Sequence, residues 1–329
     1  MQTRGRARFN LLRMNWLDNP ALSVEPWQVE DYRALSVGEL FQGLKRLGVA
    51  LDEVHFKAYA DHSSSPEELT ATLVSEENLE QFDPLYLIIF ELWRKLYPEK
   101  ASLSIFCDEL DHLITLYDQG QLGHEEALVE ALDDLEQVLD EHADQGEDPK
   151  VLFEEISLYC AQDLESFIYD FASELIDREE QLQASEIIDG FLPYISDIKW
   201  FDFLQLRLLT PVDTDEADAM LARLLNDQEL HPDLEFLLEM ARFLVNQGSQ
   251  EYFLQVIKMA CPLVESEEDF QELLAITYEF YRLLDREEEM QKISDLLKKT
   301  LGKEGALAKK EPLEVYCRMI SNLIGRKSI

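Results

Sequence analysis

Residues 237–264 read LLEMARFLVNQGSQEYFLQVIKMACPLV, and this stretch indicates the fold of the chain. Apolar residues recur every three or four positions on both sides of Gly248, which is the pattern of two amphipathic helices. The glycine between them permits a sharp reversal of the backbone. The stretch therefore predicts an antiparallel pair of helices over Pro232–Gln247 and Gln250–Val264.

The same arrangement recurs through the second half of the chain. Three further predicted pairs are Ser166–Arg178 with Gln181–Ile195, Trp200–Leu209 with Thr214–Asn226, and Glu267–Asp285 with Glu287–Leu301. Small residues share a register, since 34 positions separate Ala241 from Ala275 and twice that number separates Ser173 from Ala241. A repeat of this length is typical of a helical-hairpin array. Gly (12) and Pro (11) are both sparse, and no strand pattern intervenes, so we expect an all-α fold.

Specific positions in these pairs match a known repeat pattern. The matching residues are Ala241, Gly248 and Ala260 in the first stretch, Ala275 and Tyr278 in the next pair, and Tyr117, Gly120 and Ala127 in YDQGQLGHEEAL at residues 117–128. Over residues 102–301 the chain thus resembles the tetratricopeptide-repeat family. It departs from that family at Arg207 and Glu287, which stand at positions that are usually small, and it generally lacks the helix-ending proline. The resemblance implies a right-handed superhelix of helical hairpins.

The resemblance also implies a binding surface, because the first helix of each pair lines the concave groove in that family. The residues that this register would aim inward are Asp170, Glu174, Asp177, Glu235, Arg242, Asp269, Glu272 and Glu279. Nearly all are acidic, so a basic ligand is expected there. The alternative is that these side chains only solvate a surface.

Four segments are expected along the chain. They are a basic, disordered tail over residues 1–13, a helical cap over 14–82, the hairpin array over 83–302, and a linker with a C-terminal capping helix over 303–329. Within the cap, Ser36 with Glu39, Asp52, and Ser65 before Pro66 are N-terminal helix signals. Either Met1 or Met14 could be the natural start.

The net charge of −39 over 329 residues is concentrated in the middle of the chain. The first 13 residues carry four Arg and no acid, and the segment from Lys292 onward carries nine basic and four acidic residues. Residues 14–291 therefore hold 16 basic and 64 acidic side chains. Such a field repels nucleic acid from the main body and attracts basic partners. An acidic surface that serves only solubility is the alternative.

The four cysteines indicate the compartment. Cys107, Cys160, Cys261 and Cys317 are widely spaced and lie among apolar residues, so we expect reduced thiols in the core and a cytoplasmic protein. No apolar run approaches the roughly 18 residues that span a bilayer, and no secretory signal is expected.

Residues 106–120, FCDELDHLITLYDQG, contain a candidate metal motif. Glu109 and His112 have the Glu-x-x-His spacing of di-iron bundles, but a second motif of this kind is lacking, and Asp52-x-x-His55 is the nearest approach to one. A helical wheel places Asp108 and His112 on the polar face, as an exposed pair four residues apart. No catalytic motif is recognised, so we expect no metal, no cofactor and no catalytic residue.

These patterns together favour a non-enzymatic interaction module. It would be an adaptor, scaffold or chaperone that binds a basic or amphipathic peptide segment on a concave acidic surface. Two alternatives stay open: a metal-dependent helical enzyme that uses carboxylates and histidine, and a purely structural assembly subunit. The oligomeric state is not predicted.

Overall fold

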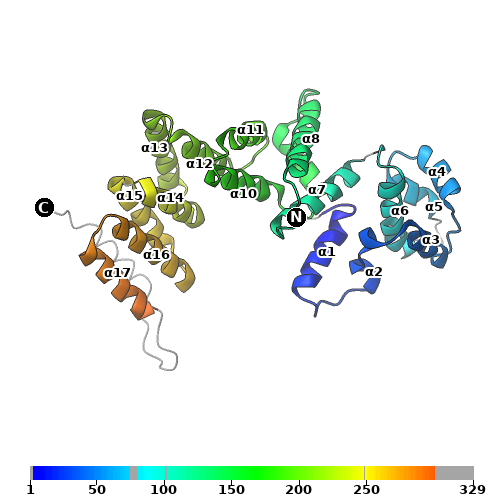
Figure 1. The fold of residues 1–329 in the computed structure, drawn as a ribbon, viewed down its shortest axis with the longest axis horizontal. Helices are drawn as coiled ribbons and strands as arrows, with labels where there is room; N and C mark the ends of the chain where they lie inside the picture. The colour runs from blue at the N-terminus through cyan, green and yellow to red at the C-terminus, as the bar shows by residue number, and fades with distance from the viewer. Residues whose placement is uncertain (1–2, 75–79, 101, 248, 301–329) are drawn as a thin grey trace. The chain divides into compact units, whose positions relative to one another are not determined.

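The fold, in a computed structural model that describes residues 3–74, 80–100, 102–247 and 249–300, is all-α, as predicted. Within these residues seventeen α-helices occur and no strand (Figure 1). The contacts divide the chain into two compact units, Met1–Ser196 and Asp197–Ile329. This division differs from the predicted boundary between residues 82 and 83. The predicted linker and capping helix over residues 303–329, together with Gly248 and Cys317, lie outside the described residues.

The first unit begins with short helices. They are α1 (Ala7–Asp18), α2 (Pro26–Val29), the 3₁₀ turn η1 (Tyr32–Ala34), α3 (Val37–Arg46), α4 (Glu53–Asp61) and α5 (Pro66–Leu73). Side chains cap three of them as the sequence predicted. Ser36 and Glu39 form a capping box, and Asp52 and Ser65 accept hydrogen bonds from backbone N–H groups three residues later.

Helix α6 (Phe82–Leu96) is the centre of this part of the molecule. Its residues from Leu85 to Trp93 are all buried, because the helix is apolar nearly all round. Helices α3 and α5 both pack against it. Since α6 supplies the surface that the N-terminal helices bury, it belongs with them, and residue 82 is not a boundary between units.

The expected disordered tail over residues 1–13 is wrong for its second half. Residues from Ala7 onward form α1, and Ala7 and Phe9 are buried. Arg6 is only 8% exposed, and its Nη2 lies 3.4 Å from Oε1 of the fully buried Glu91. A buried carboxylate requires a compensating charge, and an arginine near the N-terminus supplies it. One of the four arginines in this segment, Arg6, therefore serves an ion pair inside the fold.

Five further helices complete the first unit. They are α7 (Leu103–Asp118), α8 (Glu126–Ala143), α9 (Pro149–Ser157), α10 (Leu164–Asp177) and α11 (Gln181–Phe191). Gly120 follows α7 with a φ of 63°, in the left-handed region that glycine tolerates. Helices α10 and α11 pack together as the predicted hairpin.

The second unit contains three predicted hairpins. Its helices are α12 (Ile198–Leu209), α13 (Thr214–Leu230), α14 (Leu234–Gln247), α15 (Gln250–Ala260), the 3₁₀ turn η3 (Cys261–Leu263), α16 (Glu267–Leu283) and α17 (Glu287–Thr300). The rings of Phe253 and Phe280 stack with centroids 3.7 Å apart and join α15 to α16. Phe203 and Phe236 likewise join α12 to α14. Sequential hairpins therefore share one apolar core.

The small residues of the predicted register do not have equivalent environments. Ala241 and Ala260 are buried, as a close helix contact requires. Ala127 and Ala275 are exposed instead. The hairpin pattern is thus present, but the register that links Ala241 to Ala275 does not place both against a neighbouring helix.

Arg6 and Arg8 allow a matched test of the N-terminal ion pairs. Arg6→Ala leaves Glu91 and Asp108 short of one cation and should lower the free energy of unfolding by about 3–5 kcal/mol. Arg8 pairs with Asp83 at 2.9 Å, but both side chains are largely exposed, so Arg8→Ala should cost less than about 1 kcal/mol. Chemical denaturation followed by circular dichroism measures both. Equal losses would contradict a buried role for Arg6.

Candidate functional site

The eight residues of the predicted acidic groove are divided between the two units. Asp170, Glu174 and Asp177 lie on α10 in the first unit, and the other five lie on α14 and α16 in the second. Seven of the eight are acidic, but their surroundings differ.

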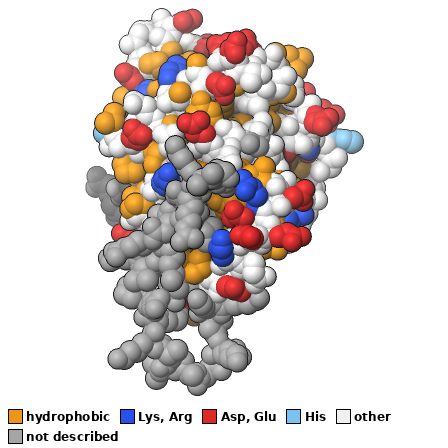
Figure 2. Space-filling model, turned by 90° about the vertical axis from the view of Figure 1, so that its left-hand side faces the viewer, with side chains coloured by type: hydrophobic (Ala, Val, Ile, Leu, Met, Phe, Trp, Pro, Cys, Tyr) orange, Lys and Arg blue, Asp and Glu red, His pale blue; other side chains and the backbone are white. Residues whose placement is uncertain are grey.

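In the second unit, three of the five predicted residues take part in ion pairs within the chain: Arg242, Glu272 and Glu279. Arg242 on α14 pairs with Glu239 on the same helix at 2.7 Å and with Glu272 on α16. Glu279 pairs with Arg282. Figure 2 shows the molecule from the side where α13–α17 lie in Figure 1, and Lys and Arg side chains lie there beside Asp and Glu. This surface carries mixed charge and is not uniformly acidic.

In the first unit, Asp170 and Glu174 line a cavity of about 380 Å³ between α7 and α10. Its remaining lining residues are Ile114, Tyr117, Asp118, Gln162, Asp163, Ser166, Phe167, Phe171 and Ser173. Asp177 lies outside it. Four carboxylates thus face one hollow, and none of the residues that line it in the described chain is Lys or Arg.

An aromatic wall forms one side of this cavity. The Tyr117 ring meets Phe167 and Phe171 edge-on, with centroids 6.0 and 5.2 Å away. The Tyr117 hydroxyl donates a hydrogen bond to the Glu174 carboxylate. Aromatic faces and carboxylates together are the groups that hold a Lys or Arg side chain.

Two of the carboxylates that line the cavity, Asp118 and Glu174, repel each other. Burial and the negative charge of Glu174 raise the pKa of Asp118 above its ordinary value. Asp163 caps the N-terminus of α10 by accepting a hydrogen bond from the Ser166 N–H. A cation bound here would relieve the repulsion between Asp118 and Glu174.

Sequence reasoning found only part of this cavity. It selected Asp170 and Glu174 from the helix register, and it noted Tyr117 and Asp118 only as a turn. The contact between Tyr117 and Glu174 joins residues 57 positions apart. No local pattern encodes that proximity, since it depends on how α7 packs against α10.

The Glu-x-x-His motif lies in a network of ion pairs instead. Glu109 accepts hydrogen bonds from Arg33 at 3.1 Å and from Arg94 at 3.2 Å. Burial and the nearby Arg33 charge lower the pKa of the half-buried His112. In the described part of the chain, no group of three or more His, Cys, Asp or Glu side chains is placed to hold a metal ion.

The predicted exposed pair of Asp108 and His112 is wrong. Asp108 is only 4% exposed and accepts hydrogen bonds from Arg33 at 2.5 Å and from Asn10 at 2.8 Å. The helical wheel identified a polar face on α7 correctly but could not show that α1 and η1 cover it. Two side chains from distant segments therefore donate hydrogen bonds to a carboxylate that the sequence placed in solvent.

Asp111 ties α7 to the chain before α10. Its carboxylate accepts hydrogen bonds from the backbone N–H groups of Ala161 at 2.8 Å and Gln162 at 3.1 Å. Burial raises its pKa to about 7, although these two N–H groups act in the opposite direction. Cys107 and Cys160 are buried thiols in the same region.

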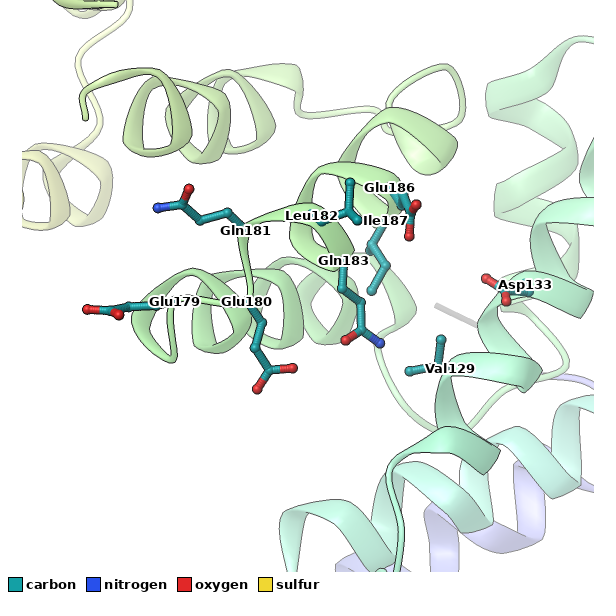
Figure 3. A pocket seen from close by; sticks show the side chains of 9 residues that line it. All are labelled: Val129, Asp133, Glu179, Glu180, Gln181, Leu182, Gln183, Glu186 and Ile187. Carbon is teal, nitrogen blue, oxygen red and sulfur yellow. The ribbon is translucent and has the colours of Figure 1, made fainter. Parts of the chain in front are cut away.

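Other hollows lie elsewhere on the two units. Figure 3 shows one in which Val129 and Asp133 approach from α8, and the remaining residues come from α11 and the turn before it. Leu182 at this site is 76% exposed. In the second unit, Lys199 bridges Asp197 and Asp233 at 2.8 and 2.9 Å beside another hollow. Charges within that hollow are again mixed.

Comparisons of the chain with family models, with curated proteins and with solved structures find no match. None of the helices in the described ranges combines the length and apolar character needed to cross a membrane.

The raised pKa of Asp111 leads to a prediction of how the stability of the fold depends on pH. Because its pKa is about 7 when folded and about 3.9 when unfolded, the folded state binds the extra proton more tightly. Its contribution to stability is present below about pH 4 and is lost as the pH rises to about 7. The melting temperature of the native protein should therefore fall relative to that of Asp111→Asn as the pH rises from about 4 to about 7.

Thermal melts of both proteins across this pH range test the prediction. Glu130→Gln, which removes an exposed carboxylate from α8, is the control and should track the native protein. A constant difference between the native protein and Asp111→Asn at every pH would show that Asp111 does not titrate in this range.

Proposed function

We propose that this protein is a non-enzymatic interaction module, an adaptor, scaffold or chaperone, that binds a basic segment of a partner protein. The cavity between α7 and α10 would receive a Lys or Arg side chain of that segment. The observation that carries the proposal is the convergence of four carboxylates and an aromatic wall on one hollow.

The physical chemistry of the cavity supports a cationic ligand over a neutral or anionic one. A cation would lie near Asp118 and Glu174, whose mutual repulsion it relieves. The Phe167 and Tyr117 rings would contact the alkyl part of the side chain and attract its charge. The excess of acidic residues in the whole chain would increase the rate of encounter at low salt.

The finer architecture is also a proposal. We infer a right-handed, tetratricopeptide-like array for the hairpins from α12 to α17 of the second unit, supported by three sequential hairpins and the buried Ala241 and Ala260. The exposed Ala127 and Ala275 are departures from that pattern. The buried thiols of Cys107, Cys160 and Cys261 support the expected cytoplasmic location.

Binding of a labelled basic peptide tests the function. A short fluorescein-labelled peptide of alternating Lys and Ala should bind the native protein and dissociate as salt is raised, since screening weakens charge attraction. Glu174→Gln and Asp118→Asn should each weaken the affinity about twofold to fivefold, as expected for a partly exposed charge pair. Fluorescence anisotropy at low and high salt measures this.

Glu130→Gln is the matched control, because it removes the same charge from α8 outside the cavity. If the control weakens binding as much as Glu174→Gln does, only the general field of the protein acts on the peptide. In that case the cavity is not the binding site.

A further inference from the structure

A second concave surface of the first unit has a different chemistry. A groove of about 710 Å³ lies along the N-terminal part of α7, the second half of α8 and α9. Its apolar lining residues are Leu103, Phe106, Val138, Leu152, Ile156 and Tyr159. It shares no lining residue with the cavity between α7 and α10.

The floor of the groove is apolar and accessible. Leu152 and Ile156 are buried at its base, whereas Leu103 is 37% exposed and Val138 and Tyr159 are half-buried. The apolar face of α8, with Leu135 and its neighbours, is buried in the core. Most of the apolar floor therefore comes from α7 and α9, and Val138 is the one apolar residue that α8 adds to the lining.

The rim of the groove is acidic on both sides. Asp134 and Glu141 are exposed on α8, and Glu155 is exposed on α9. Glu147 adds a fourth carboxylate and contacts the His142 Nδ1 at 3.4 Å. Arg4 is the one arginine in the lining, so the rim is negative overall.

The length of the groove indicates what kind of ligand fits it. From Asp134 to Glu141 the groove follows α8 for seven residues, which corresponds to about 11 Å or two helical turns. A ligand that buries an apolar stripe in the groove and places cations at both edges satisfies the floor and the rim together. An anionic membrane surface is disfavoured, because the rim would repel it.

We propose that this groove docks an amphipathic helix of a partner protein, with an apolar stripe of at least two turns flanked by Lys or Arg. The proposal rests on the proposed function in that both assign a protein partner to the chain. It names a separate surface and a partner with a different shape.

A designed peptide tests the proposal. The probe is a fluorescein-labelled Leu/Lys peptide in which Leu recurs every three or four residues, and the reference peptides are a scrambled Leu/Lys sequence and the same pattern with Glu in place of Lys. We expect the patterned Leu/Lys peptide to bind the full chain at least about tenfold more tightly than either reference, because only it matches both floor and rim. Anisotropy titrations measure the three affinities.

Two matched pairs of variants locate the binding. Glu155→Lys reverses a rim charge, whereas Glu154→Lys reverses the neighbouring exposed acid outside the groove. Val138→Ser removes apolar surface from the floor, whereas Val151→Ser does so at a 53% exposed position that does not line it. The groove variants should each weaken binding of the patterned peptide about fivefold or more, and the controls less than about twofold.

Several results would overturn the proposal. They are equal binding of the scrambled peptide, equal effects of the groove and control variants, and binding that appears only after removal of residues 303–329. A native dimer that Val138→Ser converts to a monomer in light scattering would also overturn it, since a second copy would then occupy the groove. Glu174→Gln separates the two proposals, because it acts on the Lys/Ala peptide and should leave the patterned peptide unaffected.

Discussion

Burial of the Glu91 and Asp108 carboxylates is the constraint on which the first unit depends. Neither can remain charged away from water without a compensating cation, and Arg6, Arg33 and Arg94 supply three. These arginines come from the N-terminal segment, from η1 and from α6. A single electrostatic requirement therefore gathers segments that no short-range pattern would place together.

The same network holds several polar side chains of α7 in structural contacts. Its Glu109 is held by two arginines, so the Glu-x-x-His spacing reflects ion pairing and helix packing. Asp111 is turned toward Ala161 and fixes the chain before α10. These contacts hold one side of α7 in place. Tyr117 and Asp118, at the end of the helix, therefore lie next to α10 and line the acidic cavity. The network thus positions the candidate site, and Gln162, whose N–H bonds to Asp111, also lines the cavity.

Much of the fold could be predicted from the sequence. The pairs that became α10 to α17 were recognisable because amphipathic periodicity and turn residues are local properties, and Ser36, Asp52 and Ser65 cap the expected helices for the same reason. The candidate site was recognisable only in part. Asp170 and Glu174 follow from the register of one helix, but their partner Tyr117 is reached only through packing between helices.

The sequence by itself determined an all-helical chain, its hairpins and an excess of negative charge, because helix periodicity, capping and composition act over a few residues. Only the tertiary structure decided that Arg6 and Asp108 are buried, that Glu109 is paired, and which acids converge on a hollow. Those outcomes depend on contacts between residues tens of positions apart. Those contacts decide whether a carboxylate faces solvent, an arginine or another carboxylate. Its ion pairing and its pKa depend on that neighbour.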